Sequence, residues 1–271
     1  MMDALRTVLA PNSGPMTLDG TRTFIVGCER PAVIDPGPSA GGHLDAILAA
    51  LEGRTPVAIL LTHAHGDHAE LAEPLAVRTG APVMIAPGAA HPEDDERVAW
   101  RWLEDGDAIH TDVGTLQVVA TPGHAPDHVA FHWHDRGAVF VGDLFMGEGD
   151  TTLVAPPEGD LAAYLRSLDR VASLSPTVLY PAHGPPLADP AEAVARYRRH
   201  RETRIEQVVQ ALRRAGPSRP RELLDAVYGA DLHPSLRGAA EGSLHAILGY
   251  LSAEGMAEAL PDGRHSLAGY R

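Results

Sequence analysis

The feature that most constrains the fold is an apolar strand that runs straight into a cluster of polar side chains. Residues 56–62, PVAILLT, form a continuous apolar run, as expected for a strand that is covered on both faces. The next six residues, HAHGDH at 63–68, hold three histidines and one aspartate. Such a junction predicts a layered α/β protein whose polar site lies where a buried strand ends.

Three later segments repeat this arrangement. Apolar runs at 115–121, 137–142 and 177–182 each lead to a polar residue in a turn that contains glycine or proline, and these residues are His124, Asp143 and His183. The 63–68 motif alone supplies at most four ligands, and a hydrolytic zinc ion usually takes three protein ligands and keeps one position open. Together, these positions predict a metal site assembled from several strand ends.

The rest of the apolar pattern completes two regions. Further strands are predicted at 21–27, 31–37, 81–86 and 128–133, and helices at 41–53, 70–80 and 160–174. From Asp189 and Pro190 onward the pattern becomes helical, with helices expected from 189, at 219–229 and at 235–255, and with a hairpin at 256–269 that turns at Asp262–Gly263. We therefore predict a catalytic domain over 1–188 and a helical, winged-helix-like domain over 189–271.

Charge and composition exclude several classes of protein. The 271 residues carry a formal net charge of −14 and include no lysine. Residues 1–190 hold 10 arginines and 26 acidic residues, a net charge of −16, whereas residues 191–271 have a net charge of +2. This balance disfavours a general binder of nucleic acids or anionic membranes. The single cysteine, Cys28, excludes an internal disulfide and a multi-thiolate metal site.

The ends and length of the apolar segments bear on location. The first residues lack the apolar core of a signal peptide, and no apolar run approaches the roughly 18 to 20 residues that span a bilayer. We expect a cytoplasmic protein that has no membrane partner.

The ligand pattern H-x-H-x-D-H followed by H, D and H resembles the metallo-beta-lactamase superfamily. That resemblance implies an αβ/βα sandwich and a binuclear site with two Zn²⁺ ions per chain, Mn²⁺ or iron being alternatives. It also implies a metal-bridging hydroxide as the nucleophile. The implied ligands are His63, His65 and His124 for the first metal, Asp67, His68 and His183 for the second, and Asp143 as a bridge between them.

Longer segments resemble one branch of this superfamily, the branch that contains beta-lactamase-like protein 2, an endoribonuclease. These segments are PNSGPMTLDGTRTFIVG at 11–27, GDLFMGEGDTTLV at 142–154 and the helical tail. The resemblance covers nearly the whole chain, so it implies that the C-terminal helices belong to the same architecture.

Several residues near the motifs have two interpretations. Asp67 is a catalytic candidate as well as a ligand, and His128, four residues after His124, could protonate a leaving group or be a buried supporting side chain. Asp35 could support the site or only cap its turn. The Gly- and Pro-rich segment 147–160 follows Asp143 and is a candidate substrate-facing loop.

Three functions remain open at this point. The first is hydrolysis of a small ester, thioester or lactone by a binuclear zinc site. The second is endonucleolytic cleavage of single-stranded RNA, which the arginines at 196–204 favour and the charge of residues 1–190 disfavours. The third is a di-iron oxidoreductase, although such relatives commonly place a carboxylate at the position of His65. The C-terminal domain could form a wall of the active site or the surface of a homodimer.

Overall fold

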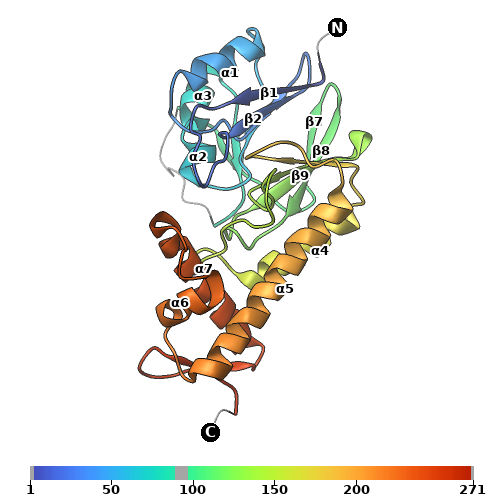
Figure 1. Ribbon diagram of the computed structural model, residues 1–271. Coiled ribbons are helices and arrows are strands. Elements are labelled where there is room, and N and C mark those ends of the chain that lie inside the picture. Colours follow the sequence, from blue (N-terminus) through green and yellow to red (C-terminus); the bar gives the residue numbers. More distant parts are fainter. Residues whose placement is uncertain (1–2, 89–96, 270–271) are drawn as a thin grey trace.

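The computed structural model describes residues 3–88 and 97–269 and contains two β-sheets that pack face to face (Figure 1). The first sheet has the strand order β1-β2-β3-β4-β5-β6. Its three N-terminal strands are antiparallel, and β3 to β6 run parallel to one another. The strands are β1 (Leu5–Leu9), β2 (Arg22–Val26), β3 (Ala32–Ile34), β4 (Ala58–Leu60), β5 (Val83–Ile85) and β6 (Trp100–Trp102).

The second sheet has the strand order β11-β10-β9-β8-β7. All its neighbouring strands are antiparallel except β10 and β11, which are parallel. The strands are β7 (Ala108–Thr111), β8 (Gly114–Ala120), β9 (Val129–Trp133), β10 (Ala138–Gly142) and β11 (Val178–Pro181).

Alternation along the strands builds the core between the sheets. In β2, Phe24 and Val26 point toward the second sheet, while Ile25 points toward the helices on the other side. In β10, Phe140 points toward the first sheet, and its ring centroid lies 5.0 Å from that of Phe24. Because side chains alternate with a period of two, each central strand contributes to two apolar layers, which explains the unbroken apolar runs in the sequence.

Helices cover the outer faces of both sheets. The helices α1 (His43–Leu51) and α3 (Ala72–Thr79) pack on the first sheet, and α4 (Leu161–Ser173) and α5 (Pro190–Ala215) pack on the second. Shorter helices are α2 (Gly66–Ala69), η1 (His134–Arg136) and η2 (Pro234–Leu236). The four layers confirm the predicted αβ/βα sandwich.

Helix α5 extends from the sandwich into the C-terminal region (Figure 1). It begins as predicted, because the Asp189 side chain accepts a hydrogen bond from the backbone N–H of Glu192 and Pro190 occupies the first turn. The helices α6 (Pro220–Tyr228) and α7 (Arg237–Ala253) follow, and then the hairpin of β12 (Ala257–Ala259) and β13 (His265–Leu267). The helical C-terminal region is thus present, and its winged-helix character stays a prediction.

One apolar cluster links the C-terminal helices to the sandwich. It includes Val141 of β10, Phe145 in the loop that follows β10, Tyr197 of α5 and Leu244 of α7, all fully buried. The ring centroids of Phe145 and Tyr197 are 4.9 Å apart. The C-terminal helices are therefore packed against the loops that follow β10, and the domain boundary at 188/189 stays a prediction.

Three strands were not predicted from the sequence, namely β1, β6 and β7. Each forms an edge of its sheet. An edge strand has one free side and carries more exposed residues, so its sequence lacks a long apolar run. Within residues 3–88 and 97–269, no helix is both long and apolar enough to cross a membrane.

Candidate metal centre

All seven sequence-predicted ligands lie together at one end of the sandwich. His63 follows β4, His124 follows β8, Asp143 directly follows β10 and His183 follows β11. The short helix α2 carries Asp67 and His68. Three groups of these side chains have ligand atoms close enough to share an ion: His63, His65 and His124; His63, His68 and Asp143; and Asp67, His68 and His183.

The first group is a cluster of three imidazole nitrogens. His65 Nδ1 lies 2.9 Å from His63 Nε2 and 3.0 Å from His124 Nε2. In the third group, His183 Nε2 lies 3.2 Å from Asp67 Oδ2, and His68 Nε2 lies 3.7 Å from the same oxygen. These distances suit side chains that converge on a common cation.

Asp143 lies between the first and the third of these groups. Its Oδ1 is 3.4 Å from His68 Nε2 and 3.2 Å from His183 Nε2. Its other oxygen, Oδ2, is 3.6 Å from His124 Nε2. One carboxylate oxygen thus faces each group, which is the arrangement that a bridging ligand requires.

The outward nitrogen of each histidine donates a hydrogen bond to the protein. His68 Nδ1 donates to Asp35 Oδ2 at 2.9 Å, His124 Nδ1 to the carbonyl oxygen of Leu153 at 2.7 Å, and His183 Nδ1 to that of Gly20 at 3.3 Å. Because the outer nitrogen carries the proton, the inner nitrogen presents a lone pair to the centre.

His63 and His65 follow the same rule. Thr62 Oγ1 donates to Asp35 Oδ2 at 2.8 Å and accepts from His63 Nδ1 at 3.0 Å. His65 Nε2 donates to Glu158 Oε2 at 2.7 Å, so His65 uses its Nδ1 toward the centre.

The inward atoms fit a metal because the protein leaves them unpaired. His68 Nε2, His183 Nε2 and Asp143 Oδ1 are buried and have no hydrogen-bond partner in the described part of the chain. Buried polar atoms without a partner are costly, and lone pairs that face one another at about 3 Å repel unless a cation lies between them. Imidazole and carboxylate ligands without a thiolate suit zinc, and also manganese or iron.

The local electrostatics also favour positive charge. Burial raises the pKa of Asp143, but His68 and His183 outweigh burial and hold this pKa well below its ordinary value. Burial lowers the pKa of His183, but the nearby carboxylates of Asp143 and Asp67 raise it to about 9. Burial raises the pKa of Asp67 as well, but its contacts with His183 and His68 lower it overall. Both carboxylates are therefore ionised and stabilise a cation beside them.

His128 is a buried supporting side chain in this structure. Its Nε2 accepts a hydrogen bond from the backbone N–H of Asp143 at 3.1 Å, and its Nδ1 donates to Thr121 Oγ1 at 2.9 Å. Burial, followed by the charge of His124, lowers the pKa of His128 to about 3. Both ring nitrogens are engaged by the protein, so the geometry favours positioning of Asp143 over the proton-donor role considered from the sequence.

Sequence reasoning missed three residues that hold the ligands. Thr62 joins Asp35 to His63, Glu158 orients His65, and Asp127 accepts a hydrogen bond from the backbone N–H of Ala64 at 2.9 Å. Asp127 lies between two motif histidines in HAPDH, which was an available signal. Glu158 is in the predicted substrate-facing loop, but nothing in its local sequence marks it. For Asp35, left open from the sequence, the structure shows the supporting contact.

A cavity of about 430 Å³ opens from this centre toward the C-terminal helices. Four ligands line it, His65, Asp67, His124 and Asp143. Thr151, Thr152 and Leu153 come from the predicted substrate-facing loop, and Arg204, Tyr228 and Leu236 come from the C-terminal region. Its volume lies within the roughly 300–1,000 Å³ of small-molecule sites.

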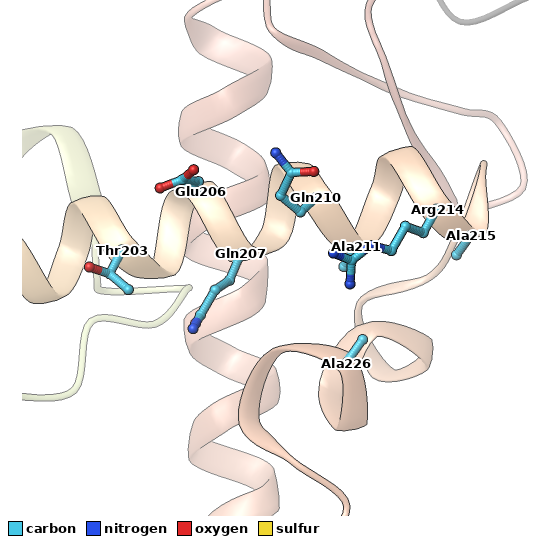
Figure 2. Close-up of a pocket in the computed structure, with 8 residues that line it drawn as sticks. All are labelled: Thr203, Glu206, Gln207, Gln210, Ala211, Arg214, Ala215 and Ala226. Atoms are coloured by element: carbon cyan, nitrogen blue, oxygen red, sulfur yellow. The ribbon is translucent and has the colours of Figure 1, made fainter.

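A second cavity, of about 600 Å³, lies between α5 and α6 (Figure 2). Its lining consists of alanines, glutamines, Thr203, Glu206 and Arg214. These residues include no histidine, cysteine or pair of carboxylates, so they lack the groups that metal-assisted hydrolysis needs. The cavity at the metal centre is therefore the candidate active site.

Known proteins are similar to this chain in sequence and in fold. A beta-lactamase-like protein 2 homolog of Caenorhabditis elegans is 29% identical over 95% of this chain and 87% of its own length. An atrochrysone carboxyl ACP thioesterase of Aspergillus chevalieri is 32% identical over 82% of this chain and 72% of its own.

Two solved structures are similar to this chain in fold. A beta-lactamase domain protein from Burkholderia ambifaria has a TM-score of 0.84 at 23% identity, covering 98% of this chain and 91% of its own. The protein TTHA1623, in a di-iron-bound form, has a TM-score of 0.54 at 32% identity, covering 70% of this chain and 98% of its own. The model of the metallo-beta-lactamase superfamily matches residues 17–183. The chain therefore belongs to the metallo-beta-lactamase superfamily, as a metal-dependent hydrolase.

Proposed function

We propose that this hydrolase has a binuclear zinc centre and cleaves a thioester. The proposal of two metal ions is supported mainly by the position of Asp143, whose two carboxylate oxygens face different groups of histidines. The thioester part is supported by a relative that is named an ACP thioesterase and is 32% identical over 82% of this chain.

Two divalent cations in such a site supply a water of lowered pKa and positive charge for the oxyanion of the reaction. The residues of the chain would hold these cations and orient the ligands. His63, His65 and His124 would hold one cation, and Asp67, His68 and His183 the other, with Asp143 between them. The carbonyl of Leu153, Asp35 and Glu158 keep three of these imidazoles in the tautomer that presents a lone pair.

The cavity supports a small acyl substrate over an RNA strand. Beside the ligands it is lined largely by apolar residues, among them Met16, Met146, Leu153, Leu232 and Leu236. An apolar wall stabilises an acyl chain, whereas single-stranded RNA is bound by stacking of successive bases on several aromatic side chains, and Tyr228 is the one Phe, Tyr or Trp among the described residues of this lining. RNA cleavage is the alternative that the following test decides.

The nature of the metal needs its own measurement. TTHA1623, 32% identical over 70% of this chain, was solved with two irons, which supports two occupied positions and keeps iron as an alternative to zinc. Metal analysis of the purified protein should give about two ions per chain. A homodimer through the C-terminal helices remains a separate prediction, and gel filtration with light scattering tests it.

The function is tested with three substrates in parallel: a thioester, a lactone and a single-stranded RNA. We expect the thioester to be hydrolysed with the highest kcat/KM and a chelator to abolish this activity. The variant Asp143→Ala should lose activity while its circular dichroism spectrum stays unchanged, and Asp112→Asn, remote from the centre, should be fully active. Full activity of Asp143→Ala would contradict the mechanism, and RNA cleavage without thioester hydrolysis would contradict the substrate.

A further inference from the structure

The arginines of α5 do not form one uniform basic face. Arg198 and Arg199 are paired with the carboxylates of Asp169 and Glu192. Arg201 and Arg204, one helical turn apart, instead line the cavity that also contains the metal ligands. In the described ranges, neither of these two forms an ion pair with a carboxylate.

Arg201 is a buried charge. Its residue is only 4% exposed. Its Nη2 donates a hydrogen bond to the carbonyl oxygen of Thr152, and its guanidinium lies 4.8 Å from the centroid of the Tyr164 ring. Its Nε is buried and has no hydrogen-bond partner among the described residues. A guanidinium in this environment lacks a counter-charge, which is costly unless a ligand supplies it.

Arg204 is held in place by neutral groups. Its Nη1 donates to the carbonyl oxygen of Val227 at 2.9 Å and to Gln207 Oε1 at 2.8 Å. Its Nε donates to His200 Nε2 at 3.1 Å, and its guanidinium lies 4.6 Å from the centroid of the Tyr228 ring. These contacts fix the direction of the guanidinium and leave its charge uncompensated.

The acidic residue next to this region does not neutralise it. Asp150 directs its Oδ1 to His200 Nδ1 at 3.3 Å, and among the described residues it forms no ion pair with either arginine. The acidic residues that line the cavity itself are Asp67 and Asp143, which belong to the candidate metal centre. The cavity would therefore have two positive regions with metals bound, one at the ligands and one at Arg201 and Arg204, and apolar side chains also line it.

We propose that Arg201 and Arg204 form an anion subsite that binds an anionic oxygen group of the substrate while its thioester lies at the metal centre. This inference rests on the proposed function and specifies its substrate class. Planar guanidinium groups bind carboxylate and phosphate oxygens through paired hydrogen bonds. The anion has two possible sources: a carboxylate on the acyl group, or the phosphate of the thiol carrier.

Two pairs of thioesters distinguish these sources. The first pair compares glutaryl and pentanoyl groups on N-acetylcysteamine, an uncharged thiol, so only the acyl carboxylate differs. The second pair compares a pentanoyl group on phosphopantetheine and on pantetheine, so only the carrier phosphate differs. We expect the anionic member of one pair to have a KM that is roughly 10- to 100-fold lower, as for a hydrogen bond to a charged group.

Substitutions then assign the preference to the two arginines. Arg204→Gln should remove most of the KM difference within the preferred pair. Arg199→Gln is the matched control, because it removes a guanidinium from the same helix at a position outside this cavity, and it should keep the preference. Arg201→Lys, which retains the charge but not the planar fork, should weaken the preference if circular dichroism shows that it folds.

Binding measurements separate this inference from the proposed function. Calorimetry measures the Kd of two pairs of free ligands. Glutarate and pentanoate can each bind the metals through one carboxylate, and only glutarate has a second carboxylate for the arginines. Phosphopantetheine and pantetheine can each bind through the thiol, and only phosphopantetheine has a phosphate. Tighter binding of glutarate or of phosphopantetheine that Arg204→Gln abolishes would support the subsite even if no thioester were hydrolysed. Equal binding within both pairs, or a preference that Arg204→Gln leaves intact, would overturn it, whether or not thioesters are cleaved.

Discussion

Asp35 Oδ2 accepts a hydrogen bond of 2.9 Å from His68 Nδ1, and the side chains of both residues are almost fully buried. The same carboxylate also accepts from the backbone N–H and the hydroxyl of Thr62, each at 2.8 Å. Asp35 therefore fixes the tautomer of His68 and, through Thr62, the ring of His63. A residue outside the ligand set thus positions one ligand from each metal group.

The substitution Asp35→Asn tests this control. An amide in place of the carboxylate weakens the hydrogen bond to His68, so we expect the affinity for the second metal to fall roughly 10- to 100-fold. Competition between the protein and a chromophoric chelator measures this affinity. Asp112→Asn is the control, because Asp112 also binds backbone N–H groups, those of Cys28, Glu29 and Arg30, but far from the centre. Equal metal affinity of the two variants would show that Asp35 does not position His68.

Removal of the metals should destabilise the whole protein. The unpaired buried atoms His68 Nε2, His183 Nε2 and Asp143 Oδ1 gain partners only when a cation binds. At a zinc concentration of about 100 times Kd, binding adds about 2.7 kcal/mol to the free energy of unfolding, a rise in Tm of roughly 5–10 °C. Calorimetric scans with zinc and with a chelator measure the rise. It should be much smaller in Asp143→Asn, and identical Tm values for the wild type in both solutions would contradict a metal centre.

Gly142 precedes Asp143 and adopts φ of 48°. A Cβ there would lie 2.7 Å from His128 Nε2 and 2.8 Å from Thr62 Oγ1, which are both buried. Gly142→Ala should therefore displace His128 and Asp143 and lower metal content and kcat together. The control is Gly53→Ala, where φ is 79° and a Cβ would meet nothing within 4 Å.

The cost of positive φ alone is about 1–2 kcal/mol, so Gly53→Ala should be less stable than the wild type but fully active. Urea unfolding and metal analysis of the two variants separate backbone strain from the steric clash. A Gly142→Ala protein with normal metal content and kcat would show that the close packing around Gly142 does not matter.

The sequence predicted most of the sandwich because its central strands are covered on both faces. Runs such as 56–62 and 137–142 must be apolar at successive positions, and this leaves a clear signal. The edge strand β1 contains no fully buried residue, because its positions are either half-buried or exposed, and its assignment depends on pairing with β2. That pairing is a tertiary contact, which local sequence does not encode.

At the candidate metal centre, too, local sequence predicts the ligands but not the residues that contact them from remote segments. The seven candidate ligands stand at strand ends beside glycine or proline, and the structure brings them together. Their outer partners come from remote segments: Glu158 contacts His65 across 93 positions, and the carbonyl of Gly20 contacts His183 across 163. Likewise, the helical period of α5 does not distinguish Arg201 from Arg198, and only the packing of Tyr164 and Thr152 buries one and not the other.

His128 should make the stability of the protein depend on pH. Its pKa is about 3 in the folded protein, against an ordinary value of 6.5. Above pH 6.5 both the folded and the unfolded state are neutral at this residue, so it contributes no pH dependence there. As the pH falls below 6.5, only the unfolded state takes up a proton, and the folded state loses about 1.4 kcal/mol of stability per pH unit.

The variant His128→Gln isolates this contribution, because glutamine can still accept the hydrogen bond from the Asp143 backbone but does not titrate. Between pH 7 and pH 5, the free energy of unfolding of the wild type should fall by about 2 kcal/mol more than that of the variant. Urea unfolding at several pH values measures the difference. If His128 only positions Asp143, the variant should also retain measurable kcat. Equal pH dependence in the two proteins, or a complete loss of kcat with normal metal content, would instead favour a residue that exchanges protons with the substrate.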